Sequence, residues 1–452
     1  MTIAGDLAAF VTSTSADAIP PLAFERARMS IASTISSAAM GVDIGSAAIT
    51  REMAQERGGT PESSIWFDSG PKLPVADVAR VNAVMSDAAA SDDSDMRNIA
   101  HIGTIVSSVG IAMAERLGKS GRDVLHAMTL GYEVAGRIDE SLTPGRGEKG
   151  FHGSVSTVFG GTVASGILLG LNASQMEHAI AIAATSIGGI GIAANTSWSR
   201  EYHAGLSAWL GINAAISAQK GFTGEPTVLE APRGFLDAMG GIERQDITKD
   251  LGKEWDIVTD MAIKLVPGGH PSHATAEAAR DAAIKGNVNP DDVANIEVSM
   301  HRLRTLSGPL HPKDLIGVAH SMSYFIGCAV AERGYGWVHA TDASKIDDPT
   351  INRLIDLITV DQNPKPDPDR FPHRHGSTVT ITMKDGTKHT AYVEMPRGSN
   401  VGGVDWNDVD GKYHTLVPLS GMSKQNIDAS LEVCHNFEQV KAMSELTSLL
   451  KR

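Results

Sequence analysis

Apolar positions recur at helical spacing through about the first 265 residues of the chain. The first amphipathic stretch follows Pro20 and Pro21, and apolar residues three and four positions apart then repeat in segment after segment. Such spacing predicts helices that bury one face each. Short helices joined by Gly- or Pro-bearing turns, with no strands between them, indicate an all-α bundle rather than βαβ units. Further helices are expected over residues 75–90, 103–117, 121–139, 155–171 and 174–187.

The last of these helices carries a recognisable start signal. Ser174 is followed three residues later by Glu177. A hydroxyl and a carboxylate at this spacing can each accept from a backbone N–H group that the first helical turn leaves unpaired. We therefore expect a capping box formed by Ser174 and Glu177.

The pattern changes after Pro267. Residues 293–300 alternate between apolar and polar, as a half-buried strand does. Residues 378–384 and 387–394 alternate in the same way around Asp385-Gly386, which is a hairpin signal. A helical piece, residues 320–333, lies between these strands.

These patterns predict a mainly α protein with two domains. A large all-helical domain is expected over residues 1–267, completed by residues 398–452. Residues 426–450 return to a helical pattern, and this tail is expected to pack back on the large domain. A smaller α+β domain is expected over residues 268–397. No internal repeat interrupts this division.

Composition excludes several classes of protein. The chain has 53 acidic and 39 basic residues, so it offers no basic surface for nucleic acid. No apolar stretch reaches the roughly 18–20 residues that a membrane span needs, and the first residues lack the basic start of a secretory signal. Two cysteines, Cys328 and Cys434, rule out a disulfide scaffold and favour a reducing compartment. We therefore expect a cytoplasmic protein.

The most acidic turn of the chain ends in a histidine. Asp92, Asp93 and Asp95 precede His101 by a few residues. Carboxylates close to a histidine can form an acid–base pair or orient its ring. The alternative is that the turn only caps the helix that follows, since Asp and Ser favour that position.

His152 lies in the sequence Gly-Phe-His-Gly-Ser, next to a predicted helix start. A titratable ring among small residues suits a general base or a carboxylate binder. A structural histidine is the equally weighted alternative.

Arg200 and His203 lie about one helical turn apart and can face the same side. Arg200 offers a fork for a carboxylate, unless it only pairs with Glu201 at the surface.

A third cluster surrounds a Gly-rich turn. Lys264 precedes this turn, and His270 and His273 follow it. The histidine spacing resembles that of metal ligands, but no third ligand completes a known pattern, so no metal site is expected. His373 and His375 are interpreted as part of a solvated loop. The sequence contains neither a Gly-x-Ser-x-Gly elbow nor a Walker loop.

In their order and spacing, these segments resemble the MmgE/PrpD family over nearly the whole chain. This family includes 2-methylcitrate dehydratases, cis-aconitate decarboxylases and iminodisuccinate epimerases. The resemblance is carried by residues 36–41, 92–94 with His101, 131–134, 150–154, 169–172, 203–205, 221–224 and 320–324.

The resemblance implies a helical domain, a smaller α+β domain, a homodimer, and no metal or organic cofactor. It also implies a small di- or tricarboxylate substrate, bound between the domains. By matching position, the catalytic residues would be His152, His101, Lys264, Tyr324 and Asp93, and the substrate-binding residues would be Asp92, Arg200, His203, His270 and His273.

These residue types suit proton abstraction next to a carboxylate. The C–H bond is weakly acidic, so a base must act together with cations that stabilise the developing enediolate. His152 or His101 would take the proton, Lys264 and Arg200 would hold carboxylates, and Tyr324 would protonate a leaving hydroxyl.

We expect a hydro-lyase similar to 2-methylcitrate dehydratase. The alternatives are an epimerase that uses two bases, a decarboxylase, and a scaffold without chemistry. The chain departs from the family where it has Ser94, Ile102 and Arg200 in place of the usual threonine, proline and lysine. These departures disfavour methylcitrate itself.

Overall fold

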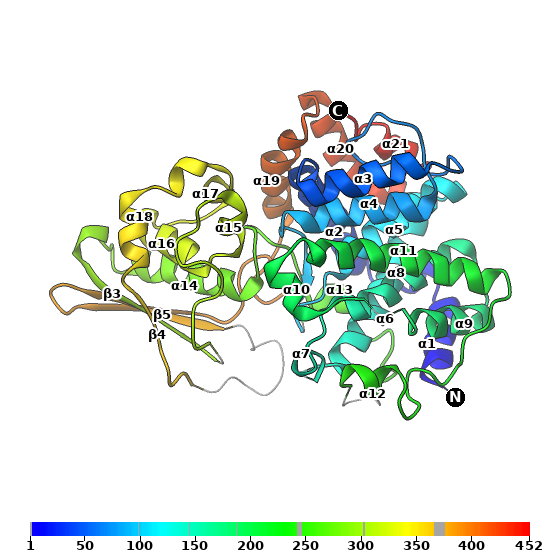
Figure 1. Cartoon of the computed structure of the whole chain (residues 1–452), viewed down its shortest axis with the longest axis horizontal. Helices are drawn as coiled ribbons and strands as arrows, with labels where there is room; N and C mark the ends of the chain where they lie inside the picture. Colours follow the sequence, from blue (N-terminus) through cyan, green and yellow to red (C-terminus); the bar gives the residue numbers. More distant parts are fainter. Residues whose placement is uncertain are drawn as a thin grey trace. The chain divides into compact units, whose positions relative to one another are not determined.

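The computed structural model describes residues 2–97, 99–143, 145–186, 188–241, 246–301, 303–365 and 376–452, so that His373 and His375 lie outside the described residues. The chain forms two compact units (Figure 1). The larger unit contains Met1–Ile263 and Val409–Arg452, and the smaller unit contains Lys264–Asp408.

The larger unit is almost entirely helical, which confirms the expected fold class together with the mixed smaller unit. Among the described ranges, no helix is both long enough and apolar enough to cross a membrane. The helices are α1 (Ile3–Ser13), α2 (Pro21–Gly41), α3 (Gly45–Arg57), α4 (Val75–Ala88), α5 (Ile102–Leu117), α6 (Gly121–Ser141), α7 (Gly145–Glu148), α8 (Ser154–Leu169), α9 (Ala173–Ala183), α10 (Gly191–Thr196), α11 (Ser199–Gln219), α12 (Phe235–Met239), α13 (Asp256–Thr259), α19 (Trp406–Leu416), α20 (Lys424–His435) and α21 (Ser444–Thr447).

Helix α8 forms the centre of this unit. It packs against α5, α6, α9 and α11 and is buried along most of its length. Small residues allow the close approach: a Cβ added to Gly131 of α6 would lie 2.5 Å from the carbonyl oxygen of Gly160, and one added to Gly211 of α11 would lie 2.9 Å from the carbonyl carbon of Gly161. Glycines at these contacts therefore allow the helices around the candidate site to pack closely.

The start of α9 differs from the expected capping box. Asn172 is the N-cap, and its side chain and that of Gln175 accept from each other's backbone N–H groups. The prediction of Ser174 and Glu177 was therefore wrong by two residues. Glu177 instead accepts a hydrogen bond of 2.7 Å from the hydroxyl of Thr2 on the N-terminal segment.

The smaller unit contains a four-stranded sheet with helices packed against it. Strand order is β4 (Ile358–Val360), β3 (Val293–Met300), β5 (Ser377–Met383) and β6 (Lys388–Val393), with only the β3–β4 pair parallel. Strands β3, β5 and β6 confirm the predicted strands and hairpin. Helix α14 (His270–Lys285) packs on β5, β6 and α16 (Met322–Glu332), and the remaining helices are α15 (Leu315–His320), α17 (Trp337–Thr341) and α18 (Pro349–Ile355).

A buried arginine holds the acidic turn of the larger unit. Strand β1 (Ser94–Asp95) pairs with β2 (Met261–Ala262), and Arg97 follows directly. The Arg97 guanidinium forms ion pairs with Glu140 on α6, Asp256 on α13 and Asp260, the last at 2.7 Å. One cation therefore connects the turn to two other segments.

Replacing Arg97 by methionine is expected to reduce the free energy of unfolding by about 3–5 kcal/mol, because buried carboxylates would lose their countercharge. Thermal unfolding of the variant measures this loss. The matched control is Arg452→Met, which breaks a surface pair with Asp43 and should cost about 0–1 kcal/mol. Equal losses in both variants would contradict the role given to Arg97.

Candidate active site

Three histidines from separate parts of the larger unit lie in a row. His101 precedes α5, His152 precedes α8, and His203 lies near the start of α11. The ring centroids of His101 and His152 are 6.1 Å apart, and those of His152 and His203 are 5.8 Å apart. Because α8 packs against both α5 and α11, the bundle brings these helix starts together.

The backbone at Gly189 packs closely against the side chains of His152 and His203. The His152 N–H donates to the Gly189 carbonyl at 3.1 Å. Gly189 has a φ of 93°, and an added Cβ would lie 3.1 Å from Cβ of His152 and 3.2 Å from Nδ1 of His203. A larger residue would therefore displace both rings. On the other side, the Ser154 hydroxyl lies 2.7 Å from Nδ1 of His152.

Asp92 orients His101. Nδ1 of His101 lies 2.7 Å from Oδ2 of Asp92, and Thr104 donates to the same oxygen at 2.8 Å. Asp92 is fully buried. A carboxylate on one ring nitrogen fixes the orientation of the imidazole and leaves the other nitrogen to exchange protons.

The other two rings of the row are uncharged at neutral pH. Burial lowers the pKa of His152 well below its ordinary value of 6.5, and the nearby His101 and Arg146 lower it further. Burial also lowers the pKa of His203, although the Asp87 carboxylate opposes this shift. An uncharged imidazole is a base, so His152 is suited to accept a proton.

The turn between α4 and α5 is strained at both ends. Ala90 has a φ of 51° and Ile99 a φ of 58°. The left-handed region is costly for residues with a Cβ, above all for a β-branched residue, and such strain costs about 1–3 kcal/mol per residue. The surrounding contacts must hold this conformation, which places Asp92 against His101.

Asp93 is hydrogen-bonded to helix α2. It is fully buried and accepts a 2.7 Å hydrogen bond from the Ser30 hydroxyl on α2. A Cβ on Gly103 would overlap its carboxylate, so a glycine in the first turn of α5 makes room for it. Burial raises the pKa of Asp93 to about 6, although the Ser30 hydrogen bond lowers it.

The Arg200 guanidinium binds other groups of the protein. Its Nε lies 3.2 Å from Oδ2 of Asp87, and its Nη2 donates to the carbonyls of Asp87 at 2.6 Å and Ala88 at 3.3 Å. These are the last carbonyls of α4, which lack partners within the helix. Arg200 therefore caps α4 and neutralises Asp87, and the weak contact with Glu201 at 4.0 Å is secondary.

Three expected site residues belong to the smaller unit. Lys264 is buried and follows β2 by two residues, and His270 and His273 lie in the first turn of α14. The two rings have centroids 5.1 Å apart. Nε2 of His273 lies 3.2 Å from the Pro267 carbonyl, so that nitrogen carries a proton.

Tyr324 lies in an apolar core of the smaller unit. Its side chain is fully buried among Val266, Phe325 and Cys328, and its hydroxyl donates to the His339 carbonyl at 3.0 Å. Burial raises its pKa well above the ordinary value of 10. The hydroxyl would have to leave this bond before it could donate to a substrate.

The sequence did not single out several residues that complete the site. Asp87, Thr104, Ser154 and Gly189 all contact the row or its carboxylates. Gly189 lies in a glycine-rich segment, and that signal alone does not say what the glycine covers. Asp87 lies inside a helical pattern, where nothing local distinguishes it from a solvated residue.

Donor atoms of Asp87, Asp92 and His101 lie within 4.8 Å of one another. The 2.7 Å separation of Asp92 and His101 is a hydrogen-bond distance, whereas two ligands of one tetrahedral ion lie about 3.4 Å apart. Arg200 already places a positive charge beside Asp87. These contacts fit a group of ion pairs better than a metal site.

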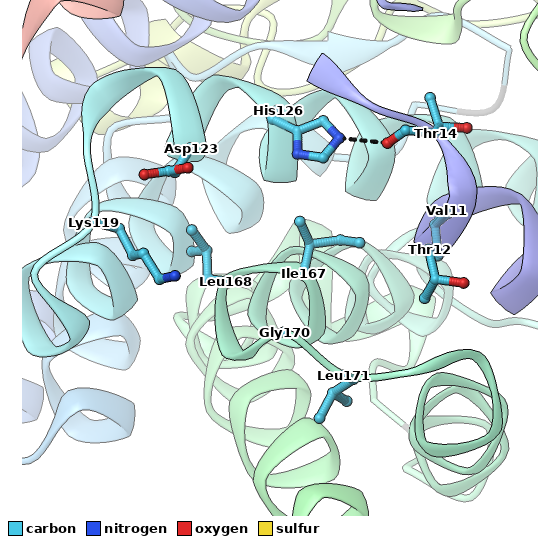
Figure 2. Close-up of a pocket in the computed structure, with 10 residues that line it drawn as sticks. All are labelled: Val11, Thr12, Thr14, Lys119, Asp123, His126, Ile167, Leu168, Gly170 and Leu171. Atoms are coloured by element: carbon cyan, nitrogen blue, oxygen red, sulfur yellow. Dashed lines mark hydrogen bonds between the residues drawn. The ribbon is translucent and has the colours of Figure 1, made fainter. Parts of the chain in front are cut away.

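A cavity of about 220 Å³ lies elsewhere in the larger unit (Figure 2). It is lined by residues from the ends of α1 and α8 and by Lys119, Asp123 and His126. His126 donates to the Thr14 carbonyl at 2.8 Å, and Asp123 belongs to the capping box of α6. The cavity lies at the opposite end of α8 from His152, about 24 Å away along the helix, and its titratable side chains serve the fold.

Replacing His152 by glutamine should lower turnover by about 10²–10⁴-fold with folding intact, because the amide cannot accept the proton. The wild-type rate should stay constant from neutral pH to below pH 6.5, since protonation of His152 requires more acid than an ordinary histidine does. Rates measured across this range test both points. The control is His126→Gln, which should leave the rate unchanged, and an acid limb above pH 6.5 would contradict the assignment.

Replacing Arg200 by lysine keeps the charge but removes the planar fork. We expect a loss of about 1.5–3 kcal/mol in stability from the lost charged hydrogen bonds, seen as a lower Tm, with a smaller change in KM. A large rise in KM with an unchanged Tm would instead mean that Arg200 binds the substrate.

The chain was compared with known proteins. The MmgE/PrpD N-terminal domain matches residues 5–248, and the MmgE/PrpD C-terminal domain matches residues 267–436. A cis-aconitate decarboxylase from Homo sapiens is 25% identical over 403 residues, which cover 86% of this chain and 82% of the relative. Two further cis-aconitate decarboxylases are also similar. The one from Mus musculus is 26% identical, and the match covers 86% of this chain and 81% of the relative. The one from Aspergillus terreus is 24% identical, and the match covers 88% of this chain and 85% of the relative. Because the two domain models together span most of its length, the chain belongs to the MmgE/PrpD family.

Proposed function

We propose that this protein is a lyase that acts on a small di- or tricarboxylate and begins by removing a proton from the carbon next to a carboxylate. The observation that carries the proposal is the row of His101, His152 and His203, in which the central ring is held uncharged. An uncharged base flanked by a carboxylate-oriented histidine suits proton transfer at carbon.

The roles follow from the contacts of each ring. His152 accepts the proton. His101 supplies a proton to the departing group, because Asp92 offsets the positive charge that the ring carries when it is protonated. His203 lines the other side of His152 and contacts the substrate. Asp93 stays buried behind the turn that carries Asp92.

Carboxylate binding is assigned, from the resemblance, to Lys264, His270 and His273. Stabilising the enediolate requires such donors, because the base alone leaves the new negative charge uncompensated. Arg200 acts indirectly, by pairing with Asp87. Tyr324 is less available than His101 as the acid, because its hydroxyl already donates a hydrogen bond to the His339 carbonyl.

Loss of water is the outcome that this arrangement supports best. A neutral base and a separately oriented acid are the two groups that an elimination needs. Decarboxylation is the second candidate, favoured by the relatives that are named cis-aconitate decarboxylases. We also retain, from the resemblance, an epimerase as a third outcome, a homodimer, and a cytoplasmic location.

Proton NMR in heavy water with methylcitrate, citrate, cis-aconitate, malate, tartrate and iminodisuccinate tests the proposal. We expect an alkene to form from a hydroxy acid, together with deuterium exchange that His152→Gln abolishes. Carbon dioxide release from cis-aconitate would support the decarboxylase, and exchange without an alkene would support the epimerase. No reaction of any compound, with the protein folded, would contradict the assignment to this substrate class.

A further inference from the structure

A buried lysine from the C-terminal segment reaches the strained turn of the site. Lys412 lies on α19 and is only 1% exposed. An ammonium group is rarely buried so completely, because removing it from water costs several kcal/mol unless it is bound by polar partners. Its partners therefore indicate why it is there.

The contacts of Lys412 converge on the turn. Nζ donates to the hydroxyl of Ser33 on α2 at 2.8 Å and to the carbonyl of Ser91. Ser91 lies between the strained Ala90 and the site residue Asp92. One turn before Ser33, Ser30 donates to Asp93. Helix α2 thus presents two hydroxyls, one to the turn itself and one to the lysine that holds it.

The charge of Lys412 also acts on the turn. Burial raises the pKa of Asp93 to about 6, the Ser30 hydrogen bond lowers it, the neighbouring Asp92 raises it, and Lys412 and His101 lower it. Asp93 in turn raises the pKa of the buried Tyr132 on α6, which is therefore also within electrostatic reach of this carboxyl. Without the lysine, Asp93 would keep its proton to a higher pH, and Ser91 would lose a hydrogen bond.

We propose that Lys412 is a positioning residue of the active site, which holds the Ser91–Asp93 turn and, through Asp92, the ring of His101. The C-terminal segment is then part of the catalytic apparatus as well as of the fold. This inference rests on the proposed function of the histidine row, but the geometry that it describes can be tested without any substrate.

The first test compares Lys412→Met with Lys412→Arg. Loss of the charge should lower kcat/KM by about tenfold to a hundredfold through misplacement of the turn, acting on kcat more than on KM. It should also move upward the part of the acid limb to which Asp93 contributes, because Asp93 would then keep its proton to a higher pH. Lys412→Arg, which keeps the charge, should recover part of both effects. The control is Lys424→Met on α20, whose side chain is 86% exposed and whose loss should change neither.

The second test needs no turnover. In protein labelled with ¹³C-histidine, the His101 Cε1–H signal, assigned by its absence in His101→Gln, should shift in Lys412→Met and in Ser33→Ala. Ser33→Ala removes one partner and keeps the lysine, so it serves even if Lys412→Met fails to fold. An unchanged His101 signal in the folded variants, with only a lower Tm, would overturn the proposal. If the wild type turns over no substrate but this signal moves, the proposed function fails while the positioning role stands.

Discussion

The contact between Asp92 and His101 is the interaction on which the site depends. It spans 2.7 Å between the partly exposed His101 and the fully buried Asp92, and the turn that provides it is strained at Ala90 and Ile99. The chain can hold such a turn only if neighbouring elements over-determine its conformation. Much of the larger unit can be understood as that support: α2 supplies Ser30, α5 supplies Thr104, and α19 supplies Lys412.

Buried charge is balanced around this turn by three cations from three directions. Arg97 binds the carboxylates of α6 and α13, Arg200 binds Asp87 and the end of α4, and Lys412 binds the turn backbone. Each cation satisfies groups that would be costly to bury alone. Within the histidine row, burial without a carboxylate partner lowers the pKa of His152 well below its ordinary value.

The sequence was most informative where structure is local. Helical spacing located the helices of the larger unit, and period-two alternation located β3, β5 and β6. Fixed motifs pointed to His101, His152 and His203, which do lie together.

The sequence could not show that Arg200 caps α4, that the Tyr324 hydroxyl binds a backbone carbonyl, or that Lys412 reaches Ser91. These contacts join residues far apart in the chain, and no local pattern encodes which partner a buried side chain meets. The capping box of α9 failed for a different reason, since Asn172 offered a competing cap two residues earlier.

The most direct test of the account is an NMR titration of His152 in the folded protein, with its signal assigned by its loss in His152→Gln. The account predicts that the ring stays uncharged through pH 6.5 and takes up a proton only in more acidic solution, while the other rings of the row keep their places. A midpoint at or above pH 6.5 would mean that burial does not lower the pKa of this ring, and it would contradict the account.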